Sequence, residues 1–165
     1  MKMIGLLLLI LSSTSLLGQG DSLGVFENLV GSTWISSGKQ LGGHDGKTVK
    51  EISWGLDGEI VKVKSYTTDP KTLKFGLRNE GVRIYNVQTQ QLEFYEFDKL
   101  GGVSKGVIKT EGKSLHYEYE YGGLLLRDSW IYKSKDEYLF RVCSLSEKGE
   151  CLQTYHEGKF IRQKK

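Results

Sequence analysis

The chain has 165 residues, of which 38% are hydrophobic and 26% charged, and its 23 basic and 20 acidic residues leave a net charge of +3. This length corresponds to one domain, large enough to bury a core without metals or many disulfides. The small charge excess, clustered only at the C-terminal basic residues, excludes nucleic acid as an expected partner.

Residues 1–20 have the three parts of a cleavable signal peptide. Lys2 supplies a positive start, residues 4–11 are apolar, and residues 12–20 are small and polar. The apolar part is shorter than the roughly 20 residues of a membrane span, although an uncleaved anchor is an alternative. The leader has no cysteine for lipid attachment. We therefore expect residues 21–165 to form one exported domain, soluble in the periplasm or secreted, with no transmembrane segment after cleavage.

The rest of the chain has the composition of an antiparallel sheet protein, with nine Tyr, six Phe and three Trp, 21 Gly and one Pro. A short helix is expected within 21–30, where three apolar residues share a helical face. The expected strands are 31–40, 48–56, 59–67, 81–87, 91–97, 103–110, 114–121, 124–133, 137–144 and 151–163, with a weaker strand or loop at 72–77.

The regular spacing of these strands, with hairpin signals such as Asp57-Gly58, predicts the topology. We predict an all-β fold, an antiparallel up-and-down β-barrel of about ten strands with a short N-terminal helix. A β-sandwich is the alternative.

The two cysteines, Cys143 and Cys151, flank a turn-like segment almost symmetrically. A hairpin would place them on facing strands, so in an oxidising compartment we expect a disulfide. Their spacing is not that of a C-x-x-C redox or metal site.

Trp34 follows Gly31 at the start of the first expected strand, and Arg162 lies in the last. This arrangement resembles the lipocalin and wider calycin family, although the spacing here is G-x-x-W rather than G-x-W. The nearest likeness is to exported bacterial lipocalin-like domains of unknown function. The resemblance implies a calycin barrel with a small apolar ligand, closed at one end by Trp34 with Arg162 packed over it; a guanidinium stacks well on an indole.

Two neighbouring expected strands each have an apolar or aromatic face, which predicts the lining of a cavity. Alternate residues of 115–121 are apolar or tyrosine, and Asp128 lies among apolar residues on one face of 124–133. The expected ligand-binding residues are Tyr117, Tyr119, Leu126, Asp128, Trp130 and Tyr132. Ordinary core packing is the alternative for the tyrosines, and an Asp at the barrel mouth or paired with Arg is the alternative for Asp128.

No cofactor or metal is expected. A zinc site would require His44, His116 and His156 to converge, and their contexts do not suggest this; His116 should face solvent. Haem bound by one histidine such as His156, as in nitrobindin-like barrels, has no further support. Common enzyme motifs are absent. Strand carboxylates, Glu96 included, are interpreted as a solvated face.

The leading hypothesis is an exported lipocalin-like carrier that binds a small apolar or amphipathic ligand in the barrel. Two alternatives remain: an envelope structural or interaction module with a filled core, and an enzyme that uses Asp128 or His156.

Overall fold

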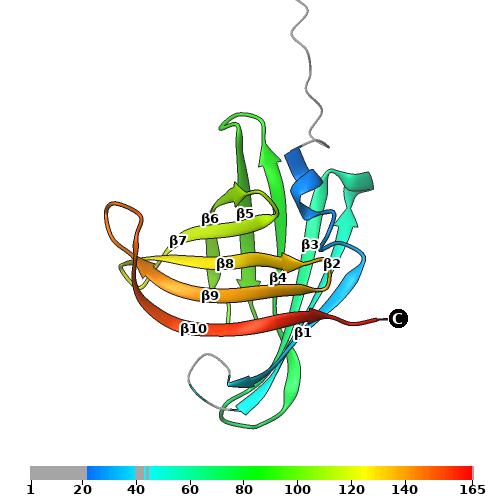
Figure 1. Cartoon of the computed structure of the whole chain (residues 1–165), viewed down its shortest axis with the longest axis vertical. Helices are drawn as coiled ribbons and strands as arrows, with labels where there is room; N and C mark the ends of the chain where they lie inside the picture. The colour runs from blue at the N-terminus through cyan, green and yellow to red at the C-terminus, as the bar shows by residue number, and fades with distance from the viewer. Residues whose placement is uncertain (1–21, 40–42, 44, 165) are drawn as a thin grey trace, which may run out of the picture.

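Ten antiparallel strands close into a barrel in the computed structural model, which describes residues 22–39, 43 and 45–164 (Figure 1). The strands are β1 (Ser32–Lys39), β2 (Asp45–Gly55), β3 (Ile60–Thr68), β4 (Phe75–Asn86), β5 (Gln91–Asp98), β6 (Val103–Glu111), β7 (Ser114–Tyr121), β8 (Leu124–Ser134), β9 (Glu137–Leu145) and β10 (Cys151–Arg162). Two short 3₁₀ helices, η1 (Gly24–Phe26) and η2 (Leu56–Gly58), accompany them.

Each strand pairs with the next along the chain, and β1 pairs with β10 to close the barrel. The predicted all-β, up-and-down antiparallel barrel is thereby confirmed, and the sandwich is excluded. The weak segment 72–77 and the expected strand 81–87 are parts of the single strand β4. An irregularity in its pairing with β3, between Ser65 and Tyr66, interrupts the alternation of faces and so obscures this continuity in the sequence.

Of residues 21–30, expected to contain a short helix, the structure describes 22–30, where the three-residue η1 lies. Its neighbours Leu23 and Leu29 are fully buried with Phe26, so the segment packs as an apolar plug. The predicted leader, residues 1–20, lies outside the described residues. Within the described part of the chain, no helix has the length and hydropathy needed to cross a membrane.

This plug closes one end of the barrel together with Trp34, which is fully buried and donates from its indole Nε1 to the Leu29 carbonyl oxygen at 3.1 Å. The guanidinium of Arg162 lies 4.6 Å from the centre of the Trp34 ring. It also donates from Nε to the Lys135 carbonyl oxygen at 3.0 Å and from Nη2 to the Asn28 carbonyl oxygen. Arg162 therefore ties the last strand to the plug and to the β8–β9 turn.

The opposite end carries the β3–β4 and β5–β6 connections, with the end of β1 and the start of β2, and we call it the mouth. In Figure 1, η1 lies at the end where β4 turns into β5, while the β3–β4 connection lies at the other end. Strands therefore run alternately from mouth to plug and back. A residue's place along its strand fixes its depth in the barrel.

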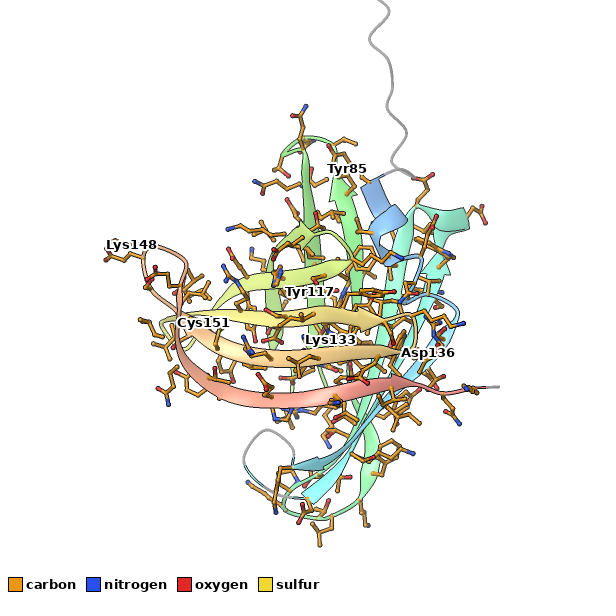
Figure 2. The ribbon with its side chains drawn as sticks, viewed as in Figure 1. Tyr85, Tyr117, Lys133, Asp136, Lys148 and Cys151 are labelled. Atoms are coloured by element: carbon orange, nitrogen blue, oxygen red, sulfur yellow. A yellow bond between two sulfur atoms is a disulfide. The ribbon has the colours of Figure 1, made fainter. Side chains whose placement is uncertain are left out.

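The predicted disulfide joins Cys143 in β9 to Cys151 in β10, with the Cα atoms 5.7 Å apart. Figure 2 shows Cys151 at the base of the β9–β10 turn that carries Lys148. The pairing of the two strands shifts register near this turn, so Cys143 lies opposite Thr154 rather than opposite its disulfide partner. The disulfide thus fixes an irregular end of the hairpin.

Candidate functional site

A cavity of about 550 Å³ opens at the mouth. Its lining consists of inward residues from β1 to β4, the β3–β4 and β5–β6 connections, and inward residues of β9 and β10. The lining residues are Ser36, Thr48, Lys50, Ser65, Thr67, Thr68, Asp69, Pro70, Lys71, Gly76, Arg78, Asn79, Lys99, Leu100, Phe140, His156 and Phe160. This volume lies within the range typical of small-molecule sites.

The mouth cavity combines apolar surface with positive charge. Phe140 and Phe160 form an edge-to-face pair, with ring centres 5.7 Å apart. Four basic side chains, those of Lys50, Lys71, Arg78 and Lys99, line the cavity with one carboxylate, that of Asp69. Hydrogen bonds from the backbone amides of Thr72 and Lys71 lower the pKa of Asp69 to about 2, so it stays ionised. The mouth therefore suits an amphipathic molecule better than a wholly apolar one.

Deeper in the barrel lies a smaller chamber of about 60 Å³. Lys50 and Phe140 line both the chamber and the mouth cavity, so the two spaces adjoin. The chamber is lined by Lys50, Arg83, Phe94, Glu96, Ser104, Tyr117, Tyr119, Asp128, Trp130 and Phe140. Two basic and two acidic side chains are therefore enclosed among aromatic rings, and Figure 2 shows Tyr117 near the centre of the barrel.

Arg83 and Glu96 form the ion pair of this chamber. The Arg83 Nη2 donates to Glu96 Oε2 at 2.8 Å, and their side chains are only 5% and 19% exposed. Asn79 donates to the other carboxylate oxygen of Glu96. Burial alone would raise the pKa of Glu96, but Lys50, Arg83 and Asn79 together lower it, so Glu96 is an anion.

Two aromatic rings and a glycine hold the Arg83 guanidinium in place. Its central carbon lies 5.2 Å from the centre of the Tyr117 ring and 5.7 Å from that of Phe94. At Gly81, an added Cβ would lie 2.7 Å from Arg83 Nη1 and 2.4 Å from the Tyr95 carbonyl oxygen. A side chain at position 81 would therefore displace the guanidinium.

Asp128 is the second carboxyl group of the chamber, and it has no arginine partner of its own. Its Oδ1 accepts a hydrogen bond from the Tyr119 hydroxyl at 3.0 Å. Burial raises the pKa of Asp128 to about 6, and Glu96 adds to this, while Lys50 and Tyr119 act in the opposite direction. Burial and Asp128 together raise the pKa of Tyr119, so its hydroxyl stays a donor. Asp128 can therefore gain or lose a proton near neutral pH.

Lys50 lies between the two spaces. Its Nζ donates to Ser65 Oγ at 3.1 Å and lies 5.9 Å from the centre of the Phe140 ring. Burial lowers the pKa of Lys50, and nearby Arg83 contributes, while Glu96 and Asp128 oppose the change. The Lys50 amine thus lies where the mouth cavity meets the chamber.

The structure brings together four of the six expected ligand-binding residues: Tyr117, Tyr119, Asp128 and Trp130 line the chamber. Leu126 and Tyr132 line neither the chamber nor the mouth cavity. Tyr132 packs edge-to-face on Tyr138 with ring centres 5.5 Å apart, and Leu126 is buried where β8 pairs with Ser144.

The histidines occupy three different settings. His156 lines the mouth cavity with its ring 6.0 Å from that of Phe140, so both residues of the enzyme hypothesis, His156 and Asp128, face the interior. His116, expected to face solvent, is only 19% exposed and bonds through Nδ1 to Ser129 Oγ at 2.9 Å. It lies on the outer face of β7, with its Nε2 3.7 Å from Glu111 Oε2. His44 lies outside the described residues.

The sequence interpretation missed Lys50, Arg83 and Glu96. In β4, the alternation suggests that Val82 and Ile84 face inward, whereas Arg83 is the buried residue and they are half-buried. Glu96, interpreted as part of a solvated face, points into the barrel. One signal was available: Lys50, Glu96 and Asp128 each lie on the mouth side of an inward apolar residue two positions away, which is Ile52, Phe94 and Trp130 respectively.

Comparison with known proteins adds no relationship. No protein-family model matches the chain, and no curated protein sequence matches it. The functional argument therefore depends on the barrel interior itself.

Proposed function

We propose that this barrel is a lipocalin-like carrier that binds a small amphipathic molecule, admitted through the mouth. The observation that carries the proposal is the cavity of about 550 Å³, which combines the Phe140 and Phe160 rings with four basic side chains. An amphipathic ligand would place its apolar part against the rings and its polar part toward the charged chamber.

The closed end supports the lipocalin-like part of the proposal. Arg162 stacked on Trp34 is the arrangement that the family resemblance implies, at the end where the plug lies. The aromatic core beside it is filled, with Trp130 stacked on Phe160 at 4.7 Å and Tyr138 edge-to-face with Trp34 at 5.2 Å. The plug end is packed with side chains, whereas the mouth end holds a cavity. Because a carrier needs such a cavity, this arrangement favours a carrier over a module with a solid core.

The proposal includes export from the cytoplasm. Support comes from the Cys143–Cys151 disulfide, since such bonds persist mainly in oxidising compartments. The predicted signal peptide at residues 1–20 agrees with this destination. The carrier would act in the periplasm or outside the cell.

A neutral fluorescent probe, N-phenyl-1-naphthylamine, tests whether the mouth cavity binds ligands. Thr67→Trp would fill the cavity that Thr67 lines, while Lys64→Trp places the same ring on the exposed outer face of the same strand. We expect the wild type and Lys64→Trp to bind the probe alike, and Thr67→Trp to bind it at least about tenfold more weakly. Absence of probe binding, or equal binding by the two variants, would refute the proposed function.

A further inference from the structure

The inner chamber contains hydrogen-bond donors without acceptors. Arg83 Nε and Nη1 are buried and have no hydrogen-bond partner among the described residues, although Nη2 is bound to Glu96. An arginine side chain is always charged and presents five donors. Buried donors are rarely left unpaired, because each then costs about 1–3 kcal/mol. The Tyr117 hydroxyl lies close enough to the guanidinium to help raise the pKa of Arg83, but it does not satisfy Nε and Nη1. The site can therefore take a further acceptor.

We propose that the chamber is a subsite for the carboxylate of the bound molecule, with Arg83 as the residue that recognises it. The inference rests on the proposed function, since the rest of the ligand would occupy the mouth cavity. Arginine suits this task because its planar fork of donors matches the two oxygens of a carboxylate.

The size of the chamber fits this ligand group. Its volume of about 60 Å³ is about that of two water molecules at about 30 Å³ each, so a two-oxygen group fits and a large polar headgroup does not. Because Lys50 and Phe140 line both spaces, a chain attached to that group would pass directly into the mouth cavity. The ligand class is thus a small carboxylic acid with an apolar body.

The charges of the chamber also favour an anion once Asp128 is protonated. The groups that face the chamber are the basic Lys50 and Arg83, the acidic Glu96 and Asp128, and the hydroxyls of Tyr117 and Tyr119. Glu96 is already bound by Arg83 and Asn79. Protonation of Asp128, whose pKa is about 6, removes a negative charge that would repel a bound carboxylate. Below about pH 6 the chamber therefore accepts the proposed ligand more readily.

The test compares decanoate with 1-decanol, two probes with the same chain length, by calorimetric titration at about pH 5.5. We expect the wild type to bind decanoate at least about tenfold more tightly than the alcohol. In the double variant Arg83→Met/Glu96→Gln, which removes the ion pair without leaving either charge alone, the preference should fall below about threefold. The control Arg78→Gln removes an arginine of the mouth cavity and should retain the full preference.

Binding of neutral N-phenyl-1-naphthylamine shows whether the cavity of each variant is intact. If the double variant does not fold, Arg83→Lys serves instead: it keeps the charge near Glu96 but lacks the Nε and Nη1 donors, and its preference should fall at least about threefold. Equal binding of decanoate and decanol by the wild type overturns the carboxylate subsite while the carrier function stands. The carboxylate subsite is also overturned if the variants at Arg83 keep the preference for decanoate and Arg78→Gln loses it. That result would place recognition of the acid at the mouth. If the wild type binds neither decanoate, decanol nor the neutral probe, the proposed function itself fails, and the subsite with it.

Discussion

Replacing Asp128 by asparagine should stabilise the protein at neutral and alkaline pH but not in acid. Asparagine removes the ionisable group and keeps an oxygen to accept the hydrogen bond from Tyr119. The pKa of Asp128 is about 6 in the folded barrel, against its ordinary value of 3.8, because the carboxyl is buried. The folded state therefore binds this proton more tightly than the unfolded state does.

The sign and size of the effect follow from that difference. The stability that the protonated carboxyl provides is fully present below about pH 3.8 and is lost as the pH rises through about 6. A difference of about two pKa units, at about 1.4 kcal/mol each, corresponds to about 3 kcal/mol. Relative to the wild type, Asp128→Asn should therefore gain up to about 3 kcal/mol of unfolding free energy between about pH 4 and pH 8.

Urea unfolding of both proteins, followed by tryptophan fluorescence at several pH values in this window, measures the gain. Asp45→Asn is the matched control, because the Asp45 side chain is 77% exposed and forms an ion pair with exposed Lys39. Its difference from the wild type should stay small at every pH. A difference between Asp128→Asn and the wild type that does not change from pH 4 to pH 8 would refute the placement of Asp128 in a desolvated site.

Three further variants test the rest of the barrel by the same unfolding measurement. Arg162→Ala should lower the unfolding free energy by about 2–3 kcal/mol, because it removes the ring stacking and the bonds to backbone carbonyls; a loss under about 0.5 kcal/mol would contradict this role. The double variant Cys143→Ser/Cys151→Ser should lose about 2.5 kcal/mol, and reductant should then have no further effect; equal stability of the variant and the oxidised wild type would show that the disulfide adds nothing. Arg83→Met alone should cost about 3–5 kcal/mol, because it leaves Glu96 buried without its partner, and adding Glu96→Gln should restore most of that; equal losses in the single and double variants would be incompatible with a coupled pair.

Much of the fold could be predicted from the sequence because its signals are local. Alternation of apolar and polar residues marks strands, and positive-φ turn residues mark the hairpins between them: Gly122 and Gly123, with φ of 59° and 77°, turn β7 into β8. The two-residue alternation also placed Tyr117, Tyr119, Asp128 and Trp130 on one interior wall. Phe26 and Leu29, expected to share a helical face within 21–30, are buried beside or within η1 at the plug end.

The charged half of the chamber could not be predicted by the same rule. Alternation assigns charged residues to solvent, whereas Arg83, Glu96 and Lys50 are inside because they satisfy one another across strands that are distant in sequence. Their pairing depends on barrel closure and strand tilt, which no single strand encodes. The sequence shows only a weak trace of it, a charged residue on an otherwise apolar face in several strands.

The most direct test of the carrier account is a crystal structure of the protein with 11-bromoundecanoate, whose bromine is located by anomalous scattering. The account predicts bromine within the mouth cavity, the alkyl chain beside the rings of Phe140 and Phe160, and carboxylate oxygens within hydrogen-bond distance of Arg83. Bromine found only on the outer surface of the barrel, with no acid inside, would contradict it.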